Sequence, residues 1–272
     1  MSSNRKKTYS VFLLFLLLFC SLIVNAVSAI GRKTENEKLE AARKHIIAHR
    51  GASGEAIEHS FEAYDLAIRY GCNYIEQDVV LSSDNVLFVS HDLSAERMTG
   101  EKKKYSEMSS KEIKKLHIKN GETIHSLEEV FQRYGDQITY VVELKDNQSE
   151  QFVDLVKAYN LEDRIILQSL YKEALENVEP IFPDMKKMLL VFEQNEAEEA
   201  LDLEYIDIVG LYKVLMGKEN IDKIHENGKE VNVWTLDMTD EIKNAIEWGV
   251  DTYFTNSPGK AIFLEMDLRA KS

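Results

Sequence analysis

The residues best suited to chemistry stand at the ends of short apolar runs. His49 and Arg50 follow one run, His91 follows another, and Glu76 and Asp78 stand two residues apart within a third. Imidazoles exchange protons near neutral pH, so His49 and His91 are candidates for an acid–base pair. The guanidinium of Arg50 can bind phosphate oxygens through its planar fork. Together these residue types favour an active site over purely structural roles for the two histidines.

Three carboxylates in this pattern predict a metal site. Glu76 and Asp78 leave the same face of a strand because side chains alternate along it, and Glu143 closes the apolar run 138–144. Buried carboxylates need a counter-charge, which a divalent cation supplies. All three ligands are hard oxygen donors, and the chain has the N-terminal layout of a secreted protein, which would meet calcium at levels suited to weak extracellular sites; we therefore favour Ca²⁺ over Mg²⁺. The alternative is that the acids are surface residues at strand ends. Lys145 is a second candidate for binding phosphate.

Short apolar segments alternate with helix-like segments from residue 45 onward. Several apolar segments lack polar alternation, as strands buried on both faces of a parallel sheet do. Strands are expected at 45–49, 74–79, 86–91, 138–144, 164–169, 187–192, 205–211, 230–235 and 252–255. Helices are expected between Ser60 and Gly71, after Ser109, between Ser126 and Gly135, and at 149–159, 171–178, 195–202, 219–226 and 240–248.

This βα rhythm predicts an α/β fold, a TIM-type (β/α)8 barrel that forms a single domain over residues 45–272. There are nine strand candidates for eight places. The link between 74–79 and 86–91 is too short for a helical crossover, and residues 82–85 indicate a tight turn. We therefore expect residues 79–83 to run back down before 86–91 climbs again, which would bring Asp78 and His91 to the same rim.

The N-terminal segment 1–29 has the layout of a secretory signal peptide. A basic start precedes the apolar run 11–24, and small residues lead to an expected cleavage after Ala29. An uncleaved N-terminal membrane anchor is the alternative. Residues 30–44 form a charged spacer, either a tail or a short first helix. We therefore expect a secreted, extracytoplasmic protein with no stable membrane insertion after cleavage.

Charge and cysteine content narrow the range of partners. The formal net charge is −14, and removing residues 1–29 leaves 30 basic and 47 acidic residues, so that 30 − 47 = −17. A surface this acidic repels nucleic acid and anionic membranes, and we expect neither as a partner. Cys72 would then be the single cysteine, which excludes an intrachain disulfide, and its apolar neighbours indicate a buried thiol.

At these residues the chain resembles the glycerophosphodiester phosphodiesterases, in particular their secreted bacterial members. The resemblance covers nearly all of residues 45–258. It departs from the common pattern at His59, where Asn is frequent, and at Asn256, where Asp is frequent. The matching pieces are HRGAS (49–53), Glu58, YIEQDV (74–79), SHD (90–92), VVELK (141–145), QSL (168–170), VNVWTLD (231–237) and GVDTYFTNSP (249–258).

The resemblance implies a barrel of the phospholipase C-like phosphodiesterase architecture and a divalent metal. It also implies hydrolysis of small glycerophosphodiesters to sn-glycerol 3-phosphate and an alcohol. Trp234 would line the site beside the glycerol, or pack in the core. By position, the acid–base pair would be His49 and His91, the metal ligands Glu76, Asp78 and Glu143, and the phosphate-binding residues Arg50 and Lys145.

The sequence leaves several alternatives open. The nucleophile is either the glycerol 2-hydroxyl or a water molecule, and either histidine can be the acid. A related barrel phosphodiesterase that acts on lipid head groups, phospholipase D-like or phospholipase C-like, would need a lipid-facing rim. The sequence predicts no exposed apolar loop cluster, which disfavours that activity. A non-catalytic secreted binding protein is the other alternative, although no candidate ligand or histidine is missing.

Overall fold

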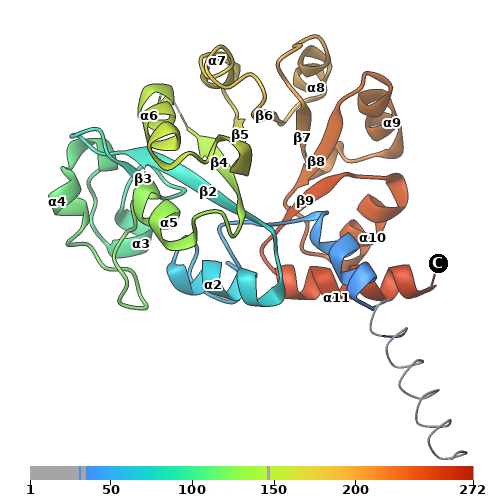
Figure 1. The fold of residues 1–272 in the computed structure, drawn as a ribbon, viewed down its shortest axis with the longest axis horizontal. Helices are drawn as coiled ribbons and strands as arrows, with labels where there is room; N and C mark the ends of the chain where they lie inside the picture. Colours follow the sequence, from blue (N-terminus) through green and yellow to red (C-terminus); the bar gives the residue numbers. More distant parts are fainter. Residues whose placement is uncertain (1–30, 32–34, 146–147, 272) are drawn as a thin grey trace, which may run out of the picture.

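Eight parallel strands close into a barrel in the computed structural model, which describes residue 31 and residues 35–145 and 148–271 (Figure 1). The ring closes because β1 pairs with both β9 and β2. The predicted α/β barrel is thereby confirmed. The strands are β1 (Ile46–Ala48), β2 (Tyr74–Leu81), β4 (Thr139–Leu144), β5 (Ile165–Ser169), β6 (Lys186–Val191), β7 (Ile208–Tyr212), β8 (Glu230–Trp234) and β9 (Thr252–Thr255).

Helices form a ring around these strands (Figure 1). The predicted start signals hold, since Ser60 and Ser126 accept hydrogen bonds from the first turns of α2 and α5. Residues 35–43 of the charged spacer are helical. The main helices are α2 (Phe61–Tyr70), α5 (Leu127–Tyr134), α6 (Ser149–Tyr159), α7 (Lys172–Glu176), α8 (Gln194–Leu201), α9 (Lys218–Glu226), α10 (Thr239–Trp248) and α11 (Pro258–Lys271), with 3-10 turns η2 (Glu162–Arg164) and η3 (Lys213–Leu215).

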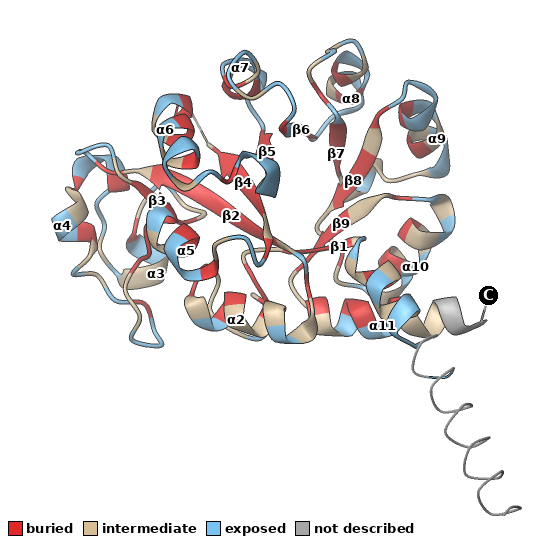
Figure 2. Cartoon of the chain, viewed as in Figure 1, coloured by how far each residue is buried: buried red, intermediate tan, exposed pale blue. Residues whose placement is uncertain are grey.

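The strands are buried on both faces, as their unbroken apolar character predicted (Figure 2). One set of strand side chains fills the barrel interior, including Ile47, Val141 and Met188. The alternate set packs outward against the helices, including Val142 and Val209. Because inward residues alternate with outward ones, a polar residue at an inward position near a strand's end faces the mouth of the barrel.

A ninth strand, β3 (Leu87–Val89), lies antiparallel to β2. The expectation that residues 79–83 descend was wrong: β2 continues to Leu81, and β3 itself runs back down after the turn at 82–85. The ladder pairs Leu81 with Leu87 and Val79 with Val89, which keeps residues 79–81 on the ascending strand. His91 therefore reaches the rim from above rather than from below.

The segment between β3 and α5 is an extension beside the barrel, at the left of Figure 1. It contains α3 (Glu96–Thr99), η1 (Tyr105–Glu107) and α4 (Ser110–Ile113). These short elements share a small core of their own, which includes Phe88, Tyr105 and Ile113. The extension thus fixes the residues that follow His91.

The N-terminal expectations fall on residues 1–29, outside the described residues. Among the helices of the described part of the chain, none has both the length and the apolar character needed to cross a bilayer.

Candidate active site

One cavity at the carboxyl ends of the barrel strands gathers every site residue that the sequence predicts. Its volume is about 180 Å³. One wall is polar and charged, and the other is apolar. The lining comprises His49, Arg50, Glu76, Asp78, His91, Glu143, Lys145, Gln168, Leu170, Leu190, Phe192, Trp234, Thr235 and Phe254. This is the end of the barrel at which such folds perform chemistry.

Arg50 is held by both its backbone and its side chain. The chain turns sharply after β1, and Arg50 takes a φ of 57°, a conformation that most residues avoid. Its backbone N–H donates to Glu76 Oε2 at 2.8 Å. Its guanidinium lies 3.2 Å from Asp78 Oδ2 and 3.2 Å from Glu58 Oε1. The positive charge of Arg50 is therefore fixed beside the acids of β2.

Lys145 links the two strands that carry the predicted metal ligands. Its Nζ lies 2.7 Å from both Asp78 Oδ1 and Glu143 Oε1. Burial opposes the charge of Asp78, but the hydrogen bond from His59 and the charges of Lys145 and Arg50 hold the pKa of this carboxyl well below its usual range. Asp78 is thus a carboxylate at neutral pH.

The other two acids remain under-compensated. Burial, and then the charge of Asp78, raise the pKa of Glu143 to about 7. The same two effects raise the pKa of Glu76 well above its usual range. A further cation at this position would offset both effects. Glu76 and Asp78 therefore fit a divalent cation, whereas Glu143, whose Oε1 lies 2.7 Å from Lys145 Nζ, is not in the candidate metal group that the described residues form.

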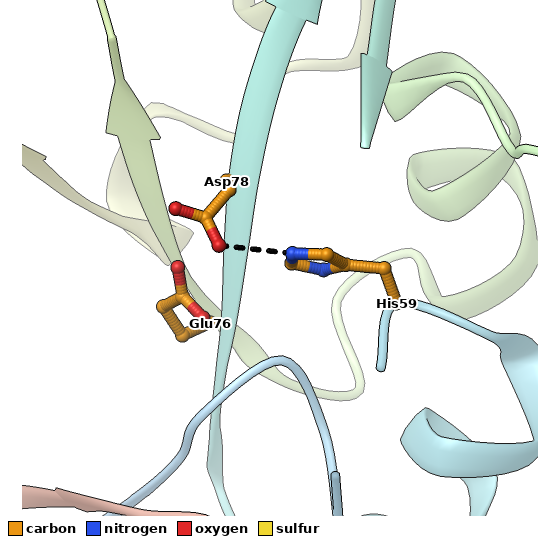
Figure 3. Close-up of side chains that lie close together, drawn as sticks. All are labelled: His59, Glu76 and Asp78. Carbon is orange, nitrogen blue, oxygen red and sulfur yellow. Dashed lines mark hydrogen bonds and ion pairs between the residues drawn. The ribbon is translucent and has the colours of Figure 1, made fainter. Parts of the chain in front are cut away.

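His59, which the sequence argument noted only as a departure from the common family pattern, lies beside the acids of β2 (Figure 3). One ligand atom each from His59, Glu76 and Asp78 lies within 4.8 Å of the others, so these residues form a candidate metal site. The His59 ring lies 2.9 Å from Asp78 Oδ2 and 2.9 Å from the Tyr64 hydroxyl. The sequence did not predict this contact, because His59 reaches Asp78 from the segment before α2 and not from a neighbouring position on β2.

His49 is oriented by a chain of hydrogen bonds at the end of β9. Asn256 Nδ2 donates to Asp237 Oδ2 at 2.6 Å, so the amide oxygen of Asn256 faces the histidine. That oxygen accepts from His49 Nδ1 at 2.7 Å, which leaves Nε2 with the lone pair. Burial, and then the charge of Arg50, lower the pKa of His49 to about 4. The Asn that departs from the family pattern thus serves as the partner of a neutral imidazole.

His91 belongs to a second chain of polar contacts. Its Nδ1 lies 2.9 Å from Asp92 Oδ1. Arg97 of α3 donates to Asp92 Oδ2 at 2.6 Å and to both oxygens of Glu58 at 2.7 and 2.8 Å. Glu58 in turn contacts Arg50. The sequence argument assigned no role to Asp92 or Arg97, although the HD pair was a signal for Asp92.

The apolar wall centres on Trp234. Its ring packs against Phe192, at 4.9 Å between centroids, and against Tyr212, at 5.3 Å. Its indole N–H donates to the backbone oxygen of Gly210 at 2.8 Å. Trp234 therefore lines the cavity and packs against the interior core of the barrel, while its place beside the glycerol stays a prediction.

A parallel barrel whose mouth gathers acids, imidazoles and cations in one cavity defines an enzyme of the TIM-barrel class. Comparison with known proteins narrows this class. The Glycerophosphoryl diester phosphodiesterase family model matches residues 49–260. The chain therefore belongs to this family, and it is an enzyme of that kind.

Individual relatives agree with this assignment. A glycerophosphodiester phosphodiesterase of Caldanaerobacter subterraneus subsp. tengcongensis is 31% identical over 236 residues, which cover 80% of this chain and 96% of the relative. One from Bacillus subtilis is 27% identical, covering 94% of this chain and 96% of the relative.

Solved structures share the fold. A glycerophosphodiester phosphodiesterase of Parabacteroides distasonis is 26% identical with a TM-score of 0.72, and the match covers 83% of this chain and 98% of that one. An Oleispira antarctica phosphodiesterase in complex with the product sn-glycerol-3-phosphate is 24% identical with a TM-score of 0.72, covering 82% and 96%.

Proposed function

We propose that this protein hydrolyses small glycerophosphodiesters to sn-glycerol 3-phosphate and an alcohol, with His49 and His91 as the acid–base pair. The observation that supports this most is that both imidazoles line one cavity with Arg50 and Lys145. The two cationic side chains can stabilise the negative charge of a phosphodiester, and the two imidazoles can transfer protons to and from its oxygens.

The surroundings of the two histidines favour different roles. His49 is neutral at pH 7 because its pKa is about 4, and its Nδ1 proton is held by Asn256. Its Nε2 can therefore accept the proton of the nucleophile. His91 has the Asp92 carboxylate as its partner, which would stabilise a ring that carries a proton. We assign His49 as the base and His91 as the acid.

Arg50, Lys145 and the apolar wall are assigned to binding the substrate. Arg50 donates to Glu58 through Nη1, and its Nε forms an ion pair with Asp78. Among the described residues no partner of Nη2 is seen, so this nitrogen is available for a phosphate oxygen. Lys145 forms ion pairs with Asp78 and Glu143 at the cavity wall, where its ammonium can also face a phosphate oxygen. The apolar wall around Trp234 suits the carbon skeleton of the glycerol.

We further propose that Glu76, Asp78 and Glu143 hold a divalent cation, with Ca²⁺ favoured over Mg²⁺ because a secreted protein meets enough calcium to fill weak extracellular sites. When bound, the cation supplies positive charge that offsets the negative charge developing on the phosphodiester. His59 is the rival third ligand. Its ring is already engaged by Asp78 and Tyr64, which favours a role in holding Asp78.

The histidine roles are tested by measuring glycerol 3-phosphate release from glycerophosphocholine. His49→Ala and His91→Ala should each lower kcat by ~10²–10⁴-fold with the fold retained. His225→Ala is the matched control, because His225 is an exposed histidine that bonds Asp251 outside the cavity. Rates like those of the unaltered enzyme in both active-site variants would exclude this assignment.

The metal is tested by chelation followed by return of Ca²⁺ or Mg²⁺. Activity should disappear with chelator and return with Ca²⁺ at lower concentration than with Mg²⁺. Glu143→Gln and His59→Asn separate the two ligand sets: calorimetric Ca²⁺ affinity should fall far more in the first. Full activity in excess chelator would remove the cation from the mechanism, and the reverse order of the variants would make His59 the ligand.

We also propose that the enzyme acts outside the cytoplasm, on the strength of the basic start and apolar run of residues 1–29. N-terminal sequencing of protein exported from an expressing bacterium should begin at Ile30. Retention of residues 1–29 on a membrane-bound product would favour the anchor instead.

A further inference from the structure

Large apolar side chains are exposed to water around one side of the catalytic mouth. Each of them lies just beyond the carboxyl end of a barrel strand, in the loops that follow β5, β6, β7 and β8. We call them the apolar rim: Leu170, Tyr171, Phe192, Val214 and Met238, which are between 39% and 74% exposed. The expectation that the loops carry no exposed apolar cluster was therefore wrong.

The apolar rim is continuous with the cavity. Leu170 and Phe192 line it directly, and the Phe192 ring packs against Trp234 on the cavity wall. The four loops lead into α7, α8, α9 and α10, which occupy consecutive positions in the ring of helices (Figure 1). The outward surfaces of these helices are largely exposed (Figure 2). Apolar side chains thus extend from the cavity wall to the exposed starts of these loops.

Single exposed apolar residues are ordinary, but a cluster around a functional opening marks an interaction site. These side chains come from four separate loop starts rather than from one flat face. Such separated projections suit insertion into a fluid apolar medium, as interfacial proteins do when they bury side chains roughly 5–10 Å into a lipid boundary.

The net charge of the same loops indicates which lipid head groups the rim would bind. Across residues 170–173, 192–196, 213–218 and 235–241 there are three lysines and six acids, so the net charge is 3 − 6 = −3. The whole chain carries −14. An anionic lipid surface would be repelled. A phosphatidylcholine surface presents trimethylammonium groups outermost, which complement an acidic rim.

We propose that the apolar rim docks on a zwitterionic lipid surface. Docking places the catalytic mouth against that surface, where it can receive glycerophosphodiesters carrying an acyl chain. The docking itself is independent of the reaction, whereas the access to acylated substrates rests on the proposed function.

Docking is tested with a polarity-sensitive dye on single introduced cysteines. Val214→Cys and Met238→Cys report the apolar rim. The matched controls are Ile181→Cys, which precedes β6 at the opposite end of the barrel, and Phe263→Cys on α11, which are 42% and 76% exposed. Cys72 is buried, and the unaltered chain gives the background from Cys20.

With phosphatidylcholine vesicles, dye emission should shift to shorter wavelength at both rim positions and stay constant at both controls. Phosphatidylglycerol vesicles should give a smaller shift. No shift at the rim, or equal shifts at all four positions, would overturn the proposal. A larger shift with phosphatidylglycerol would overturn the choice of a zwitterionic surface.

A kinetic measurement separates docking from catalysis. Val214→Ser and Met238→Ser together should lower hydrolysis of lysophosphatidylcholine in phosphatidylcholine vesicles at least 5-fold, roughly the loss of 1 kcal/mol, and leave hydrolysis of glycerophosphocholine unchanged. If the dye reports docking but the unaltered enzyme cleaves neither substrate, the proposed function fails and docking stands. If glycerophosphocholine is cleaved and the dye does not respond, docking alone fails.

Discussion

Asp92 offers the sharpest test of how this site is organised, because among the described residues that line the cavity its side chain contacts only His91. Its Oδ1 lies 2.9 Å from His91 Nδ1, and its Oδ2 is held by Arg97 at 2.6 Å. If Asp92 acts by orienting His91 and stabilising its positive charge, then Asp92→Ala should lower kcat while KM changes little.

The magnitude follows from the geometry of this pair. A hydrogen bond to a charged group contributes ~1.5–3 kcal/mol. The side chains of His91 and Asp92 are 42% and 29% exposed, so water weakens the interaction and the lower value applies. A loss of ~1.5 kcal/mol corresponds to a decrease in kcat of roughly 10-fold. This is smaller than the ~10²–10⁴-fold expected when His91 itself is removed.

The assay is a double-mutant cycle on glycerol 3-phosphate release from glycerophosphocholine. In a His91→Ala background, Asp92→Ala should have no further effect, since residues that act as one unit are not additive. Asp65→Ala is the matched control: Asp65 pairs with Arg133 at 2.7 Å and is 33% exposed, but lies away from the cavity. An unchanged kcat in Asp92→Ala, or the same 10-fold loss in both backgrounds, would refute the role assigned to Asp92.

Three further predictions concern the fold around the site. The pKa of His49 is about 4 in the folded chain, against 6.5 as the ordinary value, a difference of 6.5 − 4 = 2.5 units. Between these pH values the unfolded state binds more protons, so the free energy of unfolding should fall by at most about 3 kcal/mol as the pH drops from 6.5 towards 4. The accompanying decrease in Tm should be smaller in His49→Gln. Gly51→Ala should destabilise the protein by about 2–4 kcal/mol, because Gly51 has a φ of +79° and an added Cβ would lie 2.7 Å from the backbone of Ala63. The control is Gly121→Ala, at φ +89° with open space around it, which should lower the free energy of unfolding by only about 1 kcal/mol. Equal losses in thermal unfolding of the two variants would contradict the packing argument. Burial raises the pKa of Cys72 to about 12, so iodoacetamide at pH 8 should modify this thiol only after denaturation, and peptide mass spectrometry showing rapid modification of the native protein would contradict its burial.

Patterns within short stretches of sequence predicted most of the secondary structure. Every strand expected from apolar runs overlaps a strand of the structure, and the helices after Ser60 and Ser126 begin where their caps stand. Apolar runs, caps and glycine stops are properties of residues close in sequence, so they can be read without a tertiary structure. Such local patterns could not predict the direction of β3, because the direction of a strand is set by the strand with which it pairs.

The chemical types in the site also came from the sequence, because polar residues that close apolar runs gather at one end of a parallel barrel. What the sequence could not supply were contacts between residues far apart. His49 meets Asn256, 207 residues away, because β1 and β9 close the ring. His59 reaches Asp78 from a different element, and Arg97 ties His91's partner to Glu58.

The chain's residues therefore determined by themselves which strands form and which side chains stand at their ends. Only the closed barrel decided which of those side chains meet, which acids Lys145 pairs with, and which apolar residues at strand ends stay exposed to water. The physical reason is that periodicity and capping act within a few residues, whereas electrostatic pairing and exposure depend on the distances that barrel closure creates.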